Sequence, residues 1–326
     1  MTMTLLTIFS FFTAGASSPL PPVERDAWLI PADDDGAAPW WGIKDGIGVT
    51  VPTQHGPRGL IGIQTPYLGL PGYQTLNFVS VEPMVDGQRG YSEMEHSNLD
   101  NVQGLRLWVT DDIEPDAQPP AAGARPPKGK IETVDGVQVL SLYVHVEPMS
   151  NGARPIVQVI LRADKPYEVA FKTFTADGSA KMDSCVLSST CGNYQRLRIL
   201  RLKDKEADAL KLWEGEQTPD HGFLSPRSWS LNELVSDDKG VVVCAESDET
   251  DPAAIDAHWK YAGAPAKQYW RCPKPSEKLV CRVNARETYY GSQGAKIPGG
   301  RAFENFELED SFREGQEFIF GAPAIR

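Results

Sequence analysis

Hydrophobic and polar residues alternate along most of this chain, in short runs that turn residues separate. Side chains of a β-strand point to its two faces in turn, so this alternation predicts strands that are buried on one side. Turn signals recur about every ten residues, as is typical of a β-sandwich. The pattern therefore predicts an all-β fold, a large two-sheet antiparallel β-sandwich with a few short helices. The predicted strands cover residues 27–30, 40–51, 105–109, 131–143, 156–161, 167–174, 241–244, 269–272, 279–290 and 299–320.

Three segments do not follow the alternation clearly. Residues 205–214 and 251–261 are the helix candidates, and the second has Pro252 in its first turn, where proline is tolerated. Residues 193–203, NYQRLRILRLK, fit either a strand or a helix. These short segments leave the prediction of a β fold unchanged.

Proline and glycine also indicate how the chain is organised. Residues 63–73 are predicted to be a loop because prolines interrupt them. Residues 114–130, EPDAQPPAAGARPPKGK, are predicted to form an exposed excursion from the sandwich. Both flanks of this excursion are predicted strands, so residues 27–326 are expected to form a single domain.

One short segment occurs twice. Residues 79–89, VSVEPMVDGQR, and residues 144–154, VHVEPMSNGAR, are identical at seven of eleven positions. In each copy the valines share one strand face and a glutamate, Glu82 or Glu147, lies on the other. Each proline is expected to end the strand before an Asp-Gly or Asn-Gly turn. Either the copies are a reused strand and turn, with each glutamate bonded to nearby backbone, or both line one concave ligand face.

Titratable and aromatic side chains gather around the two copies. The candidate catalytic residues are His145, Glu304, Glu82 and Glu147. The candidate substrate-binding residues are His55, Arg58, Arg89, Glu93, Glu95, His96, Tyr143 and Arg154.

Two acidic positions have more than one interpretation. Alternation places Glu304 on the apolar face of Ala302 and Phe306, where burying an acid costs free energy unless it is hydrogen-bonded or functional. Alternatively, Phe303 points inward and Glu304 is solvated. Glu93 and Glu95 would share a strand face and could divide acid and base roles, whereas in a loop such a pair binds backbone, water or calcium.

Composition and charge limit the partners. The 326 residues are 41% hydrophobic and 23% charged, values that are usual for a globular protein. The formal net charge of −12 argues against a nucleic-acid partner, because phosphate binding needs clustered lysine and arginine.

The N-terminus has features of an export signal. The apolar run 5–13 is too short to span a bilayer, and small residues and then prolines follow it. Residues 1–16 are therefore predicted to be a signal peptide, although lysine and arginine are missing before the run, and residues 17–26 a disordered proline-rich start. A secreted or periplasmic protein is expected, with no membrane-spanning segment.

The chain has five cysteines. Cys185 and Cys191 flank a short loop, and Cys272 and Cys281 flank a turn that contains prolines, so each pair is expected to form a local disulfide. Cys244 then remains as a buried free thiol. The histidines are scattered and no Cys-x-x-Cys pair occurs, so neither a metal site nor a cofactor is predicted.

Several stretches together carry a resemblance to a known group: WGIKDGIGV, GPRGLIGIQTPYLG, NFVSVEP, GNYQRLRILRLKD, IPGGRAFENFELEDSF and GQEFIFG. With these stretches the chain resembles exported bacterial proteins of uncharacterised function, and its strand pattern resembles the galactose mutarotase-like supersandwich superfamily. That resemblance implies a sugar ligand, with His145 as a strand-borne acid and Glu304 as a base from a late strand.

Two classes of function follow from these observations. The first is an exported enzyme acting on a glycan, either a glycoside hydrolase with two carboxylates or a polysaccharide lyase. A lyase would need a cation for the substrate carboxylate, such as Arg58, Arg89 or Arg154, and a base such as His55, Tyr143 or His145. The second class is a non-catalytic carbohydrate-binding or structural sandwich. Convergence of titratable groups in one place would favour the enzyme.

Overall fold

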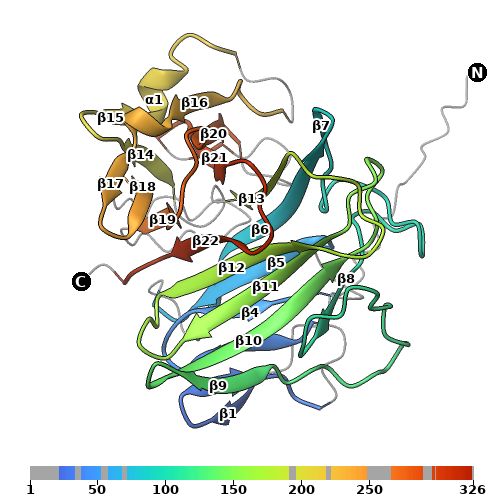
Figure 1. Ribbon diagram of the computed structural model, residues 1–326. Coiled ribbons are helices and arrows are strands. Elements are labelled where there is room, and N and C mark those ends of the chain that lie inside the picture. Colours follow the sequence, from blue (N-terminus) through green and yellow to red (C-terminus); the bar gives the residue numbers. More distant parts are fainter. Residues whose placement is uncertain are drawn as a thin grey trace, which may run out of the picture.

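The fold consists of two large antiparallel sheets that face each other (Figure 1). This computed structural model describes residues 22–33, 38–52, 58–67, 72–190, 196–217, 222–247, 266–288, 296–297 and 299–324. Within these residues each sheet has 11 strands, so the predicted all-β sandwich is confirmed. The chain passes between the sheets repeatedly, so strands that are distant in the sequence become neighbours.

The first sheet combines the N-terminal strands with late ones. Its central strands are β6, β13, β21 and β20, in that order. The strands in spatial order are β1 (Val23–Arg25), β2 (Trp28–Ile30), β3 (Trp40–Ile43), β4 (Gly48–Thr50), β5 (Leu60–Thr65), β6 (Gln74–Val85), β13 (Ser184–Thr190), β21 (Ala302–Glu309), β20 (Val280–Arg286) and β16 (Arg227–Ser230), with β7 (Gln88–Arg89) paired to β6.

The second sheet contains the middle of the chain and the last strand. In spatial order its strands are β15 (Glu206–Asp208), β14 (Leu197–Arg201), β18 (Gly240–Ser247), β19 (Lys267–Cys272), β22 (Gln316–Gly321), β12 (Glu168–Thr175), β11 (Pro155–Arg162), β10 (Val137–Val146) and β8 (Leu107–Thr110), with β17 (Val235–Asp237) paired to β18 and β9 (Lys130–Val134) paired to β10.

Helix is scarce in the described part of the chain. It contains α1 (Ala209–Leu212) and a 3-10 turn, η1 (Leu231–Glu233). The helix predicted over 205–214 is therefore wrong for its first half, which forms β15 against β14. The helix predicted over 251–261 lies outside the described residues. None of the described helices is long and apolar enough to cross a membrane.

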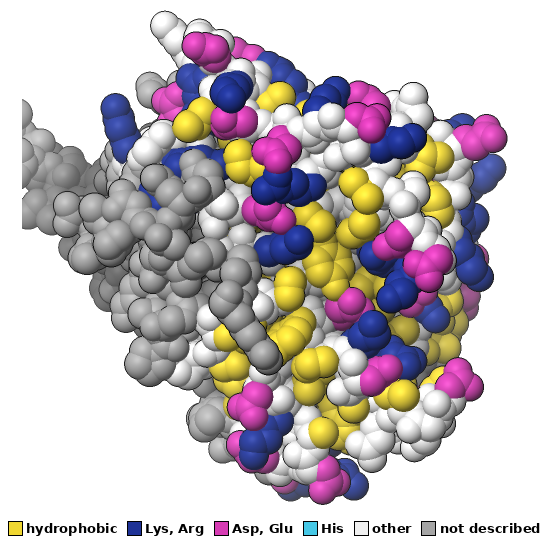
Figure 2. Space-filling view, turned by 90° about the vertical axis from the view of Figure 1, so that its left-hand side faces the viewer, with side chains coloured by type: hydrophobic (Ala, Val, Ile, Leu, Met, Phe, Trp, Pro, Cys, Tyr) yellow, Lys and Arg dark blue, Asp and Glu magenta, His cyan; other side chains and the backbone are white. Residues whose placement is uncertain are grey.

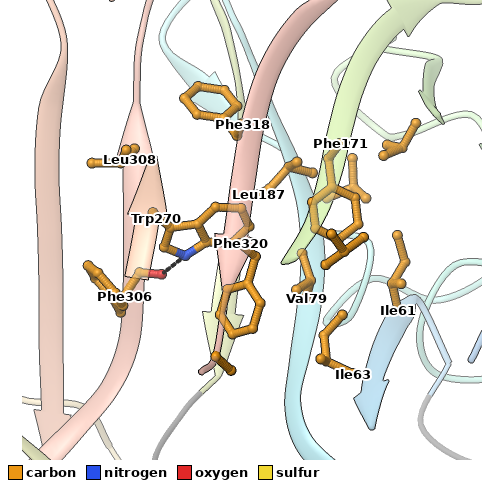
Figure 3. Close-up of a cluster of buried hydrophobic side chains, with 14 of the residues drawn as sticks. Ile61, Ile63, Val79, Phe171, Leu187, Trp270, Phe306, Leu308, Phe318 and Phe320 are labelled. Carbon is orange, nitrogen blue, oxygen red and sulfur yellow. Dashed lines mark hydrogen bonds between the residues drawn. The ribbon is translucent and has the colours of Figure 1, made fainter. Parts of the chain in front are cut away.

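The space between the sheets is filled by aliphatic and aromatic side chains. Trp270 of β19 lies among phenylalanines and donates its indole N–H to the Phe306 carbonyl at 3.0 Å (Figure 3). Valines of both repeated segments, among them Val79 and Val144, belong to the same buried cluster. The alternation therefore identified the buried faces correctly, because burial of one face per strand is what produces it.

Two details of the strand prediction need correction. Strand β5 runs to Thr65, so residues 63–65 of the predicted loop belong to a strand. Strand β6 continues through Pro83, which was expected to end it. The Pro83 carbonyl still accepts bonds, from Gly90 at 2.9 Å and from the Asn151 amide at 3.0 Å, so the strand is held although proline cannot donate.

The predicted disulfide between Cys272 and Cys281 is wrong. Both thiols are unbonded, and the segment between them crosses from β19 in the second sheet to β20 in the first instead of forming a hairpin. Cys185 is also unbonded, and Cys191 lies outside the described residues. Cys244 is a free thiol, as predicted, but it is only partly buried.

Candidate functional site

A buried group of charges lies on the outer face of the first sheet. Val79 and Val81 of β6 point into the core, so Glu82 lies on the opposite face. The Arg89 guanidinium reaches over this face from β7. Its Nη2 atom lies 2.6 Å from Glu82 Oε2 and 2.8 Å from Glu307 Oε1 of β21. Two carboxylates from distant strands therefore share one arginine nitrogen, and we call these three residues the arginine–glutamate cluster.

Small side chains leave room for the arginine to lie across the sheet. Ser80 of β6 pairs with Ser188 of β13, and the register of β13 with β21 places Glu307 opposite Ser188 on its other side. The Ser80 hydroxyl donates a hydrogen bond to Glu82 Oε1. The glutamates are only 7% and 5% exposed. Burial at this level requires partners, and Arg89 together with Ser80 supplies them.

The surroundings of Glu82 change its proton affinity. Burial and the nearby Glu307 raise the pKa of Glu82, Arg89 lowers it, and the result is a pKa of about 7. Burial is the largest of these influences because it penalises the charged form. A carboxyl group with a pKa near neutral can donate or accept a proton at neutral pH.

A β-bulge brings a third acid to the same face. Val283 pairs with Phe306 and Ala285 with Phe303, so Glu304 and Asn305 together oppose Asn284 alone. Because of the extra residue, both phenylalanines reach the core. The interpretation that placed Glu304 on the same face as Phe306 is therefore wrong, and the one with Phe303 inward is correct. That interpretation also expected Glu304 to be solvated, but the side chain is only 2% exposed.

Glu304 has charged neighbours of both signs. Burial raises the pKa of Glu304 to about 7, while Arg286 of β20 lowers it and Glu93 raises it. Burial also raises the pKa of Glu93. Arg286 shares its strand face with Arg282, which pairs with Glu307. Glu82, Arg89, Glu93 and Glu304 are thus brought to one face of the sheet.

The strand of the second copy lies in the second sheet, although its turn contacts the first copy through Asn151. Leu142, Val144 and Val146 of β10 point into the core, so Tyr143 and His145 lie on the outer face of the second sheet. His145 stacks on Trp108 with ring centroids 5.7 Å apart, and its Nε2 lies 2.9 Å from the Thr110 hydroxyl. Burial lowers the pKa of His145 to about 4.

The other residues of the second copy have local partners. Glu147 accepts a hydrogen bond from the Arg106 backbone N–H at 3.0 Å. Arg154 donates to the Asp177 carbonyl, and Tyr143 accepts from Gln158 at 3.0 Å. His145 and Glu304 lie on different sheets, so the structure does not bring together the acid and base that the resemblance implied. The two copies do not line one face.

The remaining candidates are dispersed around the first copy. Arg58 is buried and its Nη1 bonds to Asp100 at 2.7 Å. Glu95 accepts from the Ser150 hydroxyl at 2.8 Å, so it does not form an acid pair with Glu93. His96 is exposed. His55 lies outside the described residues. No group of histidine, cysteine, aspartate and glutamate that could hold a metal ion occurs in the described part of the chain.

Sequence reasoning missed Glu307 and Arg286. Alternation places Glu307 beside Glu309 on a polar face, which resembles an ordinary solvated face. The bond that identifies it joins Arg89 to a residue 218 positions later. Arg286 carried no local signal either. Only the pairing of β20, β21, β13 and β6 brings these side chains together.

Two surface hollows lie away from this face. One of about 640 Å³ is lined partly by Lys203, Asn232 and Glu277, and one of about 340 Å³ includes Arg201 and Glu246. The view from the side of β17 and β18 shows hydrophobic side chains among many of both charges (Figure 2). None of the predicted site residues lines either hollow. The arginine–glutamate cluster therefore remains the candidate site.

Comparison with known proteins adds no relative. The scan against protein-family models gives no match, and no curated protein matches the sequence. The outer face of the first sheet is therefore the feature from which a function can be inferred.

Proposed function

We propose that the chain is a carbohydrate-active enzyme, a glycoside hydrolase that uses the outer face of its first sheet. The observation that carries the proposal is the shared arginine: Glu82, with a pKa of about 7, and Glu307 both bond to Arg89 Nη2. Glu82 Oε2 and Glu307 Oε1 contact the same nitrogen, at 2.6 Å and 2.8 Å. The distance between these two oxygens is therefore at most the sum of the two contacts. Retaining glycosidases hold their two carboxyl groups about 5–5.5 Å apart.

The division of roles follows from the protonation of Glu82. As the acid, protonated Glu82 donates its proton to the glycosidic oxygen while the bond from that oxygen to the anomeric carbon breaks. As that bond breaks, Glu307 forms a bond to the anomeric carbon. Glu82, now ionised, then takes a proton from a water molecule, and the oxygen of that water attacks the anomeric carbon and breaks its bond to Glu307. Arg89 positions both groups. Glu304 and Glu93 add acidic groups on the same face.

The lyase alternative has less support. A lyase needs an unoccupied cation for the substrate carboxylate, whereas Arg89 is bonded to two glutamates and Arg154 to the backbone carbonyl of Asp177. Of the candidate bases, Tyr143 and His145 lie on the second sheet, and His55 lies outside the described residues. The arrangement of carboxylates therefore favours hydrolysis.

A second candidate is a non-catalytic carbohydrate-binding or structural sandwich. The observation in its favour is that both buried glutamates already have a partner in Arg89, as in a purely structural ion group. Such a group would hold β7 against β21 without any chemistry. The secreted or periplasmic location is likewise a proposal, and it depends on the pattern of residues 1–16 alone.

The test is hydrolysis of a glycan panel by matched variants. Glu82→Gln keeps the shape of the side chain but removes the proton donor, so kcat should fall about 10²–10⁴-fold without a lower melting temperature. Glu307→Gln should also remove activity. Glu147→Gln, the same change in the second copy, is the control and should retain activity. Full hydrolysis by Glu82→Gln, or a panel that is bound but never cleaved, would refute the hydrolase and favour the second candidate.

A further inference from the structure

Two exposed aromatic rings lie over the two arginines of this face. The Arg89 guanidinium carbon is 5.7 Å from the centre of the Tyr91 ring, and that of Arg286 is 5.0 Å from the centre of the Phe223 ring. Both rings are among the exposed large hydrophobic side chains, at 39% for Tyr91 and 45% for Phe223. Each arginine thus has carboxylates near it on the sheet and an aromatic ring toward the solvent.

The backbone fixes both rings against the sheet. Ser92 donates its N–H to the Val81 carbonyl at 3.1 Å, which holds the neighbouring Tyr91 beside β6. Leu224 donates to the Ala285 carbonyl at 2.9 Å, which holds Phe223 beside β20. Leu224 is buried whereas Phe223 is exposed, so the ring is directed away from the core.

The two rings flank one acidic strip. Glu307 and Glu304 of β21 lie between β6 and β20 in the order of strands. The pKa of Glu304 is lowered by Arg286, which contacts the Phe223 ring, and raised by Glu93, which follows Tyr91 by two residues. The strand order thus places a row of buried acids between the two exposed aromatic rings.

We infer that Tyr91 and Phe223 are stacking platforms for two sugar units of a neutral glycan, one on each side of the acidic strip. Aromatic faces contact the C–H groups of a sugar ring through apolar area, and the arginine on the other side of each ring holds it in place. This inference rests on the proposed function, and it names the class of substrate for the same site.

The charges on this face exclude an acidic glycan. Five glutamates, Glu82, Glu93, Glu304, Glu307 and Glu309, share this face with three arginines, Arg89, Arg282 and Arg286, and the whole chain carries a formal charge of −12. Arg89 is bonded to carboxylates at its edge and has a ring over its face. A uronate would be repelled by the excess negative charge. The hydroxyl groups of a neutral sugar can donate hydrogen bonds to the carboxylates and accept them from a protonated carboxyl group.

The test measures binding of defined oligosaccharides to the full chain and its variants. The probes are neutral gluco-, manno- and galacto-oligosaccharides of two to six units, with oligogalacturonate as the acidic comparison. We expect a neutral probe to bind and the acidic probe to bind at least tenfold more weakly. Tyr91→Ala and Phe223→Ala should each raise Kd about tenfold, while Tyr91→Phe, which keeps the ring, should stay near wild type. Met94→Ala, another exposed side chain in the same segment as Tyr91, is the control.

Three outcomes overturn the inference: unchanged affinity in both alanine variants, tighter binding of the acidic probe, or no binding by any probe. The unfolding transition of each variant shows whether a loss of affinity reflects the ring or the fold. The proposed hydrolase fails separately. If the alanine variants lose affinity while Glu82→Gln still cleaves as wild type does, the platforms stand and the role of Glu82 does not. If Glu82→Gln is inactive and both alanine variants bind normally, the role of Glu82 stands and the two aromatic platforms do not.

Discussion

The two copies of the repeated segment, residues 79–89 and 144–154, share seven of eleven residues but have different surroundings. Both place their valines in the same core, one from each sheet, so their glutamates point to opposite sides of the molecule. Glu82 meets an arginine and a second acid, whereas Glu147 caps a backbone N–H. Identical local sequence thus fixes which face a side chain takes, and the neighbouring strands decide what it encounters.

The largest expected difference between the copies concerns their arginines. Arg89→Ala leaves Glu82 and Glu307 buried without their cation, and should cost roughly 3–5 kcal/mol of unfolding free energy. Arg154→Ala loses a bond to a loop carbonyl and should cost about 0.5–1.5 kcal/mol. Urea denaturation of both variants measures the difference. Equal losses would show that the two arginines have equivalent structural roles.

The copies should also respond to pH in opposite directions. Glu82 has its pKa raised from 4.5 to about 7, so between these values the folded state holds a proton that the unfolded state has released, and stability falls as pH rises. His145 has its pKa lowered from 6.5 to about 4, so in that window the unfolded state binds the extra proton, and stability rises with pH. Each effect is at most about 3 kcal/mol.

Single variants separate these two contributions. Glu82→Gln should make stability rise more steeply with pH between about 4.5 and 7, and His145→Gln should make it fall more steeply between about 4 and 6.5. The measurement is the urea midpoint at half-unit steps of pH, with Glu95→Gln as a control for loss of a more exposed acid. Parallel profiles for wild type and both variants would contradict the opposed environments of the copies.

The smallest expected difference lies in the turns. Gly87 and Gly152 have φ values of 75° and 83°. A Cβ atom added at Gly87 would have no neighbour within 4 Å, whereas one added at Gly152 would lie 3.3 Å from the Ala180 Cβ. Gly87→Ala should therefore cost about 1–2 kcal/mol from backbone strain alone, and Gly152→Ala slightly more. Thermal unfolding of the pair resolves this order. A larger loss at Gly87 would mean that the first turn is the more tightly constrained one.

Much of the fold could be predicted from alternation, and part of the site could as well. Glu82, Arg89, Glu93 and Glu304 were identified as candidates by their residue types, and the structure gathers them on one sheet face. His145 and Glu147 were equally good candidates by sequence, but His145 lies on the opposite sheet and Glu147 directly follows the same strand. The unpaired Cys272 and Cys281 show the same limit, since closeness in sequence did not make them neighbours across a hairpin.

Apart from the bulged start of β21, the sequence by itself determined which residues of the strands face the core and where the Asp-Gly turns of the hairpins lie. Both depend on alternation and on left-handed backbone within a few residues. The tertiary structure decided which strands are neighbours, and with that the meeting of Arg89 and Glu307 across 218 positions. It also decided the bulge that turns Glu304 away from Phe306. Such pairings depend on burying both sheets against each other, a property of the whole chain that no local pattern contains.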